Sequence, residues 1–207
     1  RALWPDHAPL HLIFAAAGMN TIPEILGENA RRWPERAALV ATRGERDERV
    51  SFAELAASAD AFALRLAQAG ILRGDPVLVF VPMSIGLYVA LLGLFRIGAT
   101  AVFLDPSSGL GHINACCGKL PPKALVSVWP IRWLRPFVRG LRAIPKVFSP
   151  PTLSLSANDG LPAFPAPDDP ALITFTSGST GKPKAAVRSH RFLIAQHRAL
   201  EDSIALK

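Results

Sequence analysis

Residues 172–190 read LITFTSGSTGKPKAAVRSH, and the nine residues TSGSTGKPK at 176–184 decide how the chain is interpreted. An apolar run leads into threonine, serine and glycine, and two lysines on either side of a proline close the segment. Glycine lets an anion approach backbone amides, hydroxyls donate to phosphate oxygens or meet a metal, and lysine adds positive charge. This composition favours a phosphate-binding loop, with an ordinary Ser/Gly-rich turn as the alternative.

The residues on either side place this loop after a strand. Ala171–Phe175 is apolar and strand-like, and Ser189–Leu206 shows helical spacing of apolar residues, with Ser189 as a cap. A Walker A loop would have glycine in place of Thr176 and serine or threonine in place of Pro183. The GxGxxG pattern is also missing, so neither of these nucleotide-binding motifs describes the segment.

Upstream of the loop, strand-like and helix-like segments alternate. Continuous apolar runs, typical of strands buried on both faces, occur at 76–81, 100–104 and 123–128. Thr21–Glu24 and Ser51–Glu54 have the spacing of capping boxes, and a further helix is expected from Ser84 to Gly98. This alternation predicts an α/β fold: a layered, mainly parallel sheet with flanking helices.

The chain is expected to have three portions. Residues 21–148 form a first α/β portion, residues 149–170 a linker rich in proline and serine, and residues 171–207 a strand, the phosphate loop and the following helix. Within the first portion, Ile131–Lys146 predicts an amphipathic basic helix, disturbed by Pro136. A solvated face is the simplest interpretation of this helix, and peripheral contact with a membrane surface or an acidic partner is the alternative.

Composition narrows the class of protein. The 207 residues are 50% hydrophobic and 19% charged, which excludes a disordered chain. The formal charge of +7 suits an anionic partner, although a solvated surface explains it more simply. We expect no nucleic-acid partner, because no binding motif accompanies the charge. Adjacent Cys116 and Cys117 are poorly placed for a disulfide and indicate a cytoplasmic location. The sequence does not indicate an oligomeric state.

The segment 176–184 closely resembles the phosphate-loop signature of the adenylate-forming (AMP-binding) superfamily: acyl-CoA synthetases, adenylation domains of nonribosomal peptide synthetases, and luciferases. Val50–Ser84 and Leu91–Pro106 resemble the helix and strand segments that precede this loop in the family. Residues 1–207 thus resemble an incomplete N-terminal AMP-binding domain. The chain departs from the family at Ala185, where glycine is usual, and at Pro82–Ser84, where a small residue and asparagine are usual.

The resemblance implies that a carboxylic acid attacks the α-phosphorus of ATP, giving an acyl-adenylate and pyrophosphate. Coenzyme A or another thiol then usually takes the acyl group. The resemblance assigns a catalytic role to Lys184, which neutralises phosphate charge, and a contact with Mg²⁺ to Thr176. The residues it assigns to ATP binding are Thr176, Ser177, Gly178, Ser179, Thr180, Gly181, Lys182 and Lys184. His190 matches a Ser/Thr-His pair common in the family, and we expect it to be a structural cap or hydrogen-bonding residue rather than a catalytic group.

The resemblance also implies what the chain lacks. In the family, the acidic Mg²⁺ ligand, the ribose-binding aspartate and the C-terminal catalytic lysine come later than Lys207, so we expect the 207-residue chain alone to be inactive. Ile131–Lys146 is reminiscent of long-chain acyl ligases and of β-lactone synthetases that act on β-hydroxy fatty acids. We therefore expect a fatty acyl-CoA ligase-like enzyme, with a β-lactone synthetase or a non-catalytic nucleotide-binding or interaction module as alternatives.

Overall fold

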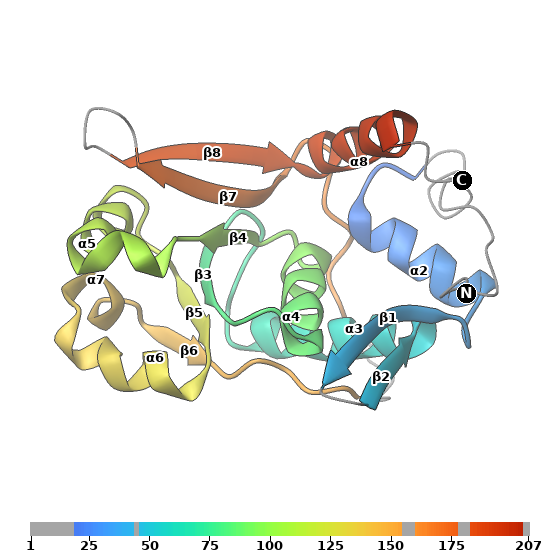
Figure 1. The fold of residues 1–207 in the computed structure, drawn as a ribbon, viewed down its shortest axis with the longest axis horizontal. Helices are drawn as coiled ribbons and strands as arrows, with labels where there is room; N and C mark the ends of the chain where they lie inside the picture. Colours follow the sequence, from blue (N-terminus) through green and yellow to red (C-terminus); the bar gives the residue numbers. More distant parts are fainter. Residues whose placement is uncertain (1–18, 44–45, 155–159, 178–182, 205–207) are drawn as a thin grey trace.

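A six-stranded sheet with strand order β6-β5-β3-β4-β7-β8 forms the centre of the molecule (Figure 1). The computed structural model describes residues 19–43, 46–154, 160–177 and 183–204. The strands are β3 (Pro76–Phe80), β4 (Thr100–Phe103), β5 (Ala124–Ser127), β6 (Lys146–Phe148), β7 (Pro170–Ser177) and β8 (Pro183–Ser189). All neighbouring strands pair in parallel except β8, which is antiparallel to β7. The predicted α/β fold with a mainly parallel sheet is confirmed.

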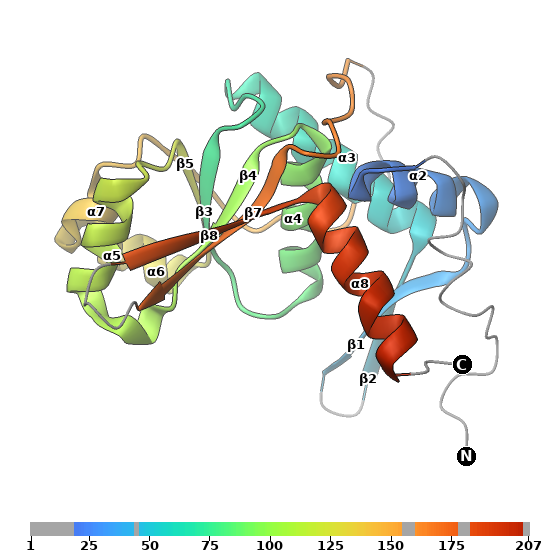
Figure 2. The same cartoon turned by 90° about the horizontal axis from the view of Figure 1, so that it is seen from above.

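Helices cover both faces of this sheet (Figures 1 and 2). The helices in the described ranges are α2 (Ile22–Arg32), α3 (Phe52–Gln68), α4 (Ile85–Arg96), α5 (Gly109–Lys119), α6 (Trp129–Leu134), α7 (Arg139–Arg142) and α8 (His190–Ile204). Residues of α3 and α4 pack on one face, and residues of α5 and α7 pack on the other. A separate antiparallel pair, β1 (Ala37–Arg43) and β2 (Arg46–Ser51), leads into α3. Within the described ranges, none of the helices has the length and apolar character of a transmembrane span.

The helices α2 and α3 begin at the predicted capping boxes. The Glu24 carboxylate accepts a hydrogen bond from the Thr21 amide at 3.0 Å, and Thr21 Oγ1 accepts one from the Glu24 amide at 3.4 Å. Ser51 and Glu54 form the same reciprocal pair at the start of α3. These contacts satisfy amides that have no partner within the helix, so each start is determined by a few neighbouring residues.

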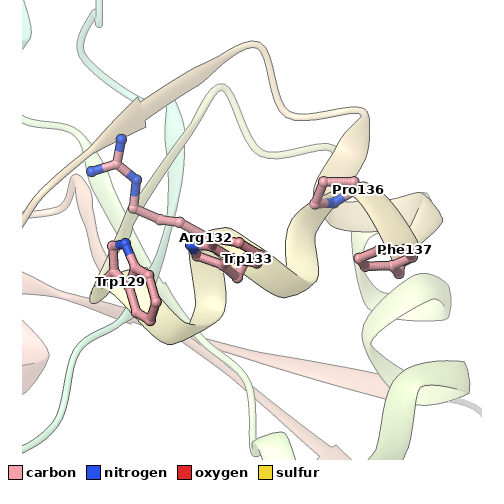
Figure 3. Close-up of a pocket in the computed structure, with 5 residues that line it drawn as sticks. All are labelled: Trp129, Arg132, Trp133, Pro136 and Phe137. Carbon is pink, nitrogen blue, oxygen red and sulfur yellow. The ribbon is translucent and has the colours of Figure 1, made fainter.

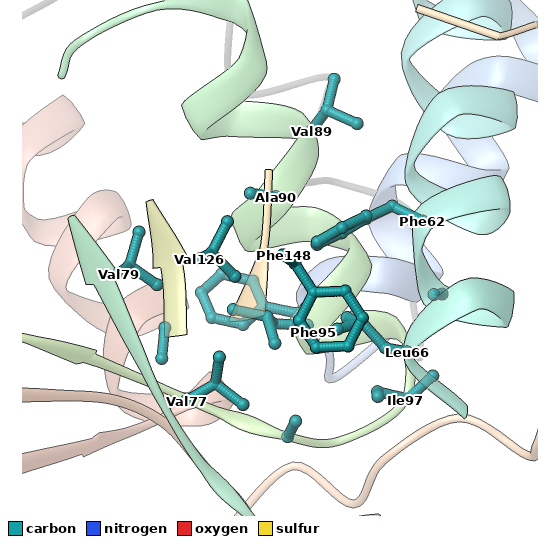
Figure 4. Packing of buried hydrophobic residues seen from close by; sticks show 14 of the residues in the cluster. Phe62, Leu66, Val77, Val79, Val89, Ala90, Phe95, Ile97, Val126 and Phe148 are labelled. Atoms are coloured by element: carbon teal, nitrogen blue, oxygen red, sulfur yellow. The ribbon is translucent and has the colours of Figure 1, made fainter. Parts of the chain in front are cut away.

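The central strands are buried on both faces because successive side chains of a strand point to opposite sides. In β3, Val77 and Val79 belong to the cluster with α3 and α4, whereas Leu78 belongs to the cluster with α5 and α7. Figure 4 shows the first cluster, in which the rings of Phe62 and Phe148 meet edge to face with centroids 6.2 Å apart. The unbroken apolar runs in the sequence therefore correspond to strands with no solvent-facing side.

The prediction of one amphipathic helix over Ile131–Lys146 is wrong. The segment contains two short helices, α6 and α7, separated by a 3-10 turn at Arg135–Phe137. Pro136 has no N–H to donate, and its ring collides with the preceding turn of an α-helix, so α6 cannot continue through it. Lys146 instead begins β6, a strand that the sequence analysis did not predict.

The segment between β6 and β7 runs alongside α3 and α4. Its described residues, 149–154 and 160–169, contain no helix or strand. The Ser154 amide donates to Ser58 Oγ of α3 at 2.9 Å, and Arg96 of α4 donates to the Pro162 carbonyl at 2.7 Å. These contacts attach the segment to the helices at two points.

Gly93 of α4 lies where α4 packs closely against α3, so a substitution there tests this packing. A Cβ atom at Gly93 would lie 2.9 Å from Phe62 Cδ1 and 3.0 Å from the Ala59 carbonyl oxygen. The two helices would have to separate, so we expect Gly93→Ala to lower the free energy of unfolding by about 1–3 kcal/mol, measured by urea denaturation.

Gly27→Ala is the matched control, because Gly27 is an exposed residue of α2 and nothing lies within 4 Å of the added Cβ. It should raise stability by about 0.5–1 kcal/mol, since alanine loses less backbone entropy in a helix. Unchanged stability in Gly93→Ala would contradict the close approach of α3 and α4.

Candidate functional site

The predicted phosphate loop joins the two strands of a β-hairpin (Figure 1). β7 ends at Ser177 and β8 begins at Pro183. The loop residues between them, outside the described residues, are Gly178, Ser179, Thr180, Gly181 and Lys182. The sequence analysis assigned no strand between the loop and the following helix, but β8 lies there. PKAAVRS, the sequence of β8, has few of the large apolar residues that indicate a strand, so its pattern gave no signal.

The structure brings the two ends of the signature together. Thr176 pairs with Lys184 in the antiparallel register, and Ser177 pairs with Pro183. The Lys184 side chain is exposed at the beginning of β8. Residues from both ends of TSGSTGKPK therefore flank the five loop residues on adjacent strands.

Pairing and ion pairs fix the base of the hairpin. β7 pairs in parallel with β4 over Leu172–Thr174. Just before β7, Asp169 contacts Arg73 at 2.6 Å, and Asp168 accepts two hydrogen bonds from Arg191, at 2.8 and 2.9 Å. A hydrogen bond from Arg73 lowers the pKa of the Asp169 carboxyl below its usual value. Both carboxylates are therefore charged at neutral pH and hold the start of the hairpin to neighbouring elements.

A lysine outside the signature also contacts the hairpin. Lys119 ends α5, and its Nζ donates to the Pro183 carbonyl at 3.0 Å. Pro183 is the first residue of β8 and precedes Lys184. The contact ties α5 to the strand that leaves the loop and places a second ammonium group near it. Sequence reasoning missed Lys119 because it lies 64 residues from Pro183 and belongs to no motif.

His190 lies at the opposite end of β8 from the loop. It comes six positions after Lys184, or roughly 20 Å along an extended strand. His190 is fully buried, its ring meets that of Phe95 edge to face at 5.4 Å, and neither ring nitrogen has a hydrogen-bond partner among the described residues. Ser189 is the cap of α8, since its Oγ accepts from the Phe192 amide at 3.2 Å. The prediction that His190 is a cap or a hydrogen-bonding residue is therefore wrong, because His190 is a core residue.

The donor set of the loop suits phosphate better than a bare metal ion. Hydroxyls, glycine amides and lysine all interact favourably with phosphate oxygens. In the part of the chain that the structure describes, no three His, Cys, Asp or Glu side chains gather as metal ligands. Hydroxyl oxygens are ligands of the kind that Mg²⁺ prefers, so a metal ion at this segment would need further oxygen ligands from a bound phosphate.

The burial of His190 predicts a pH dependence of stability. Burial lowers the pKa of His190 to about 4, from an ordinary value of 6.5, and the charges of Asp169 and Glu24 oppose this shift only in part. Protonation therefore favours the unfolded chain, so stability should fall as the pH drops from 6.5 towards 4. We expect His190 to account for about 2 kcal/mol of stability lost between pH 7.5 and pH 5 in urea denaturation.

The His190→Leu variant should lose about 2 kcal/mol less stability than the wild type between pH 7.5 and pH 5, because leucine cannot be protonated. His112→Gln is the control and should show the wild-type loss, since His112 is only partly buried, on α5. An identical loss in wild type and His190→Leu would mean that His190 is charged in the folded chain.

The chain is similar in sequence to several known proteins. The chain is 31% identical over 174 residues to an olefin β-lactone synthetase of Xanthomonas campestris, covering 78% of this chain and 31% of the relative. It is 32% identical over 188 residues to MmaC, a fatty acid–[acyl-carrier-protein] ligase of Mycobacterium marinum, covering 84% and 34%. The chain spans about a third of the length of these curated relatives.

A solved structure extends the likeness to three dimensions. The N-terminal subdomain of NpsA from Klebsiella oxytoca, in complex with 3-hydroxybenzoyl-AMSN, matches with a TM-score of 0.65 and 30% identity, over 84% of this chain and 42% of that chain. The family model for the AMP-binding enzyme matches residues 26–206, which include the whole sheet and the hairpin. The fold, the hairpin and this match together place the chain in the AMP-binding enzyme family.

Proposed function

We propose that the chain is the N-terminal part of an ATP-dependent carboxylate ligase. A carboxylate oxygen attacks the α-phosphorus of ATP, the bond from that phosphorus to the bridging oxygen breaks, and pyrophosphate leaves. The product is an acyl-adenylate. The observation that carries this proposal is the TSGSTGKPK signature, whose first and last two residues lie on paired strands, in a chain of the AMP-binding enzyme family.

In this proposal the loop binds the β- and γ-phosphates, which become the leaving pyrophosphate. Lys184 neutralises their charge, and the register that sets it opposite Thr176 supports this role. Thr176 would help to hold Mg²⁺, which would offset further phosphate charge, and Lys182 would be auxiliary. The remaining phosphate contacts come from the amides and hydroxyls of Ser177, Gly178, Ser179, Thr180 and Gly181. Catalysis of such a transfer consists mainly of positioning and charge compensation, which this donor set supplies.

We propose a fatty acid as the substrate and coenzyme A or a carrier protein as the thiol acceptor. The MmaC relative, a fatty acid ligase by its description, supports this assignment. A β-lactone synthetase is the second candidate, supported by the Xanthomonas campestris relative. Exchange of labelled pyrophosphate into ATP, with fatty, β-hydroxy fatty and amino acids as substrates, separates these candidates.

Residues 1–207 are not expected to be active alone. Because the acidic Mg²⁺ ligand, the ribose-binding aspartate and the second catalytic lysine are expected beyond it, we propose that residues 1–207 form no acyl-adenylate alone. Both cysteines are free and buried, and burial raises the pKa of Cys117 to about 11, which suits the reducing cytoplasm proposed as its location.

Lys184→Ala tests the proposed function in a protein that carries this chain with the rest of its adenylate-forming domain. The substitution removes the positive charge that compensates the leaving pyrophosphate. It should therefore lower kcat/KM for ATP by about 100-fold or more in the pyrophosphate-exchange assay. Lys123→Ala, at an exposed lysine outside the hairpin, is the control and should leave exchange unchanged. Wild-type exchange in Lys184→Ala would show that the signature does not hold the triphosphate.

Lys119→Met tests the contact between α5 and the hairpin in the same assay. Without its hydrogen bond to the Pro183 carbonyl, the strand leaving the loop loses one attachment, so KM for ATP should rise about 3- to 10-fold. Lys119→Arg retains a charged donor and should restore most of the affinity. Equal KM values in wild type and Lys119→Met would mean that the contact does not position the loop.

A further inference from the structure

A patch of large apolar side chains is exposed on α6 and the turn that follows it. We call Trp129, Trp133, Leu134 and Phe137 the aromatic patch, and Figure 3 shows its three aromatic members. Their exposed fractions are 68%, 65%, 50% and 83%. The Trp129 and Trp133 rings lie 5.4 Å apart, and both indoles, with Phe137, line a shallow hollow. Exposed apolar side chains gathered in this way usually mark a binding surface.

The backbone beneath the patch is held in place without the patch residues. Val138, Leu141 and Ile144 of the same segment are buried in the cluster that covers one face of the sheet. The Arg135 side chain donates to the Leu141 carbonyl at 3.1 Å, and the Gly140 amide donates to Asn114 Oδ1 of α5 at 2.7 Å. The exposed aromatic side chains therefore contribute little to the fold and are displayed on an ordered segment.

The net positive charge of the chain comes from the stretch of sequence that contains this patch. Between Asp105 and Asp159 the sequence contains no aspartate or glutamate. The lysines and arginines in that stretch are Lys119, Lys123, Arg132, Arg135, Arg139, Arg142 and Lys146. These are 7 of the 23 basic residues, which leaves 16 basic and 16 acidic residues in the rest of the chain. The whole net charge of +7 thus arises from the stretch that holds α5, α6, α7 and β6.

We infer that the aromatic patch binds the surface of an anionic lipid bilayer. Tryptophan and phenylalanine insert at the boundary between headgroups and acyl chains, and arginine and lysine beside them attract anionic headgroups. Arg139 and Arg142 are exposed and free to make this contact, with no acidic neighbour in their own stretch of sequence. Binding at this surface would place the protein at a membrane. The inference does not depend on the proposed function.

Other occupants fit the patch less well. A second copy of the chain would bring an equally basic surface against this one, and like charges repel. An acidic protein would match the charge, but four projecting apolar side chains need a partner surface shaped to receive them. A bilayer requires no such fixed shape, because lipid chains rearrange around inserted side chains.

The position of the patch leaves the candidate site open. α5 contacts both α7 and β8, so it lies between the segment that carries the patch and the hairpin (Figure 1). A bilayer in contact with α6 would therefore be separated from β8 by α5. Membrane binding and nucleotide binding can then occur together.

Vesicle sedimentation tests the inference with the 207-residue chain and with the longer protein that contains it. We expect sedimentation with vesicles of 70% phosphatidylcholine and 30% phosphatidylglycerol, and little with pure phosphatidylcholine. Trp133→Ser/Phe137→Ser and Arg139→Gln/Arg142→Gln should each lower the partition coefficient at least tenfold. Phe192→Ser and Arg49→Gln/Arg198→Gln remove exposed residues of the same kinds elsewhere and should keep wild-type binding.

Several results would overturn the inference. These are no binding to anionic vesicles, equal binding to neutral vesicles, or equal losses in the patch and control variants. Concentration-dependent dimerisation that requires Trp133 and Phe137, without vesicle binding, would assign the patch to a second copy. Protection of Trp129 and Trp133 from acrylamide quenching in the longer protein without vesicles would show that its own chain covers the patch. Urea midpoints within the error of wild type for all variants ensure that each loss reflects the surface and not unfolding.

Discussion

The parallel pairing of β7 with β4 is the interaction on which the candidate site depends. Residues 101–103 of β4 pair with residues 172–174 of β7, and β8 is the edge strand, paired with β7. The position of the hairpin relative to the sheet is therefore set by β7. Ile173 and Phe175 of that strand are buried, so sliding the strand by one residue would expose both. The ion pairs before β7 and the Lys119 contact at β8 secure the two ends of the hairpin against the rest of the molecule.

The parts of the fold that the sequence predicts correctly are those with local signals. Each capping box begins a helix at the expected residue, because the hydrogen bonds of a cap join residues three apart. The apolar runs of β3, β4 and β5 are unbroken because helices cover both faces of the sheet, and this requirement is visible in each strand alone. The signature at 176–184 is likewise continuous, so its position was found without knowledge of the fold.

The features that the sequence analysis missed depend on contacts between distant residues. β8 forms because β7 offers an edge for pairing, although none of its own residues is buried. Lys119 gains a role only when α5 is set beside the hairpin. The segment after β5 has the spacing of an amphipathic helix, but Pro136 divides it, and Trp133 and Phe137 face solvent instead of the core. His190 shows the opposite error, since a residue expected to form a polar contact is buried against Phe95.

The central claim is that the hairpin binds the triphosphate of the nucleotide. The most direct measurement is the NMR spectrum of the ¹⁵N-labelled 207-residue chain, titrated with inorganic tripolyphosphate and Mg²⁺. Our account predicts that the largest amide shifts fall within 176–184, with smaller shifts at the end of α5 near Lys119 and none at Lys123. Shifts of equal size over the whole basic stretch, or none at 176–184, would contradict it.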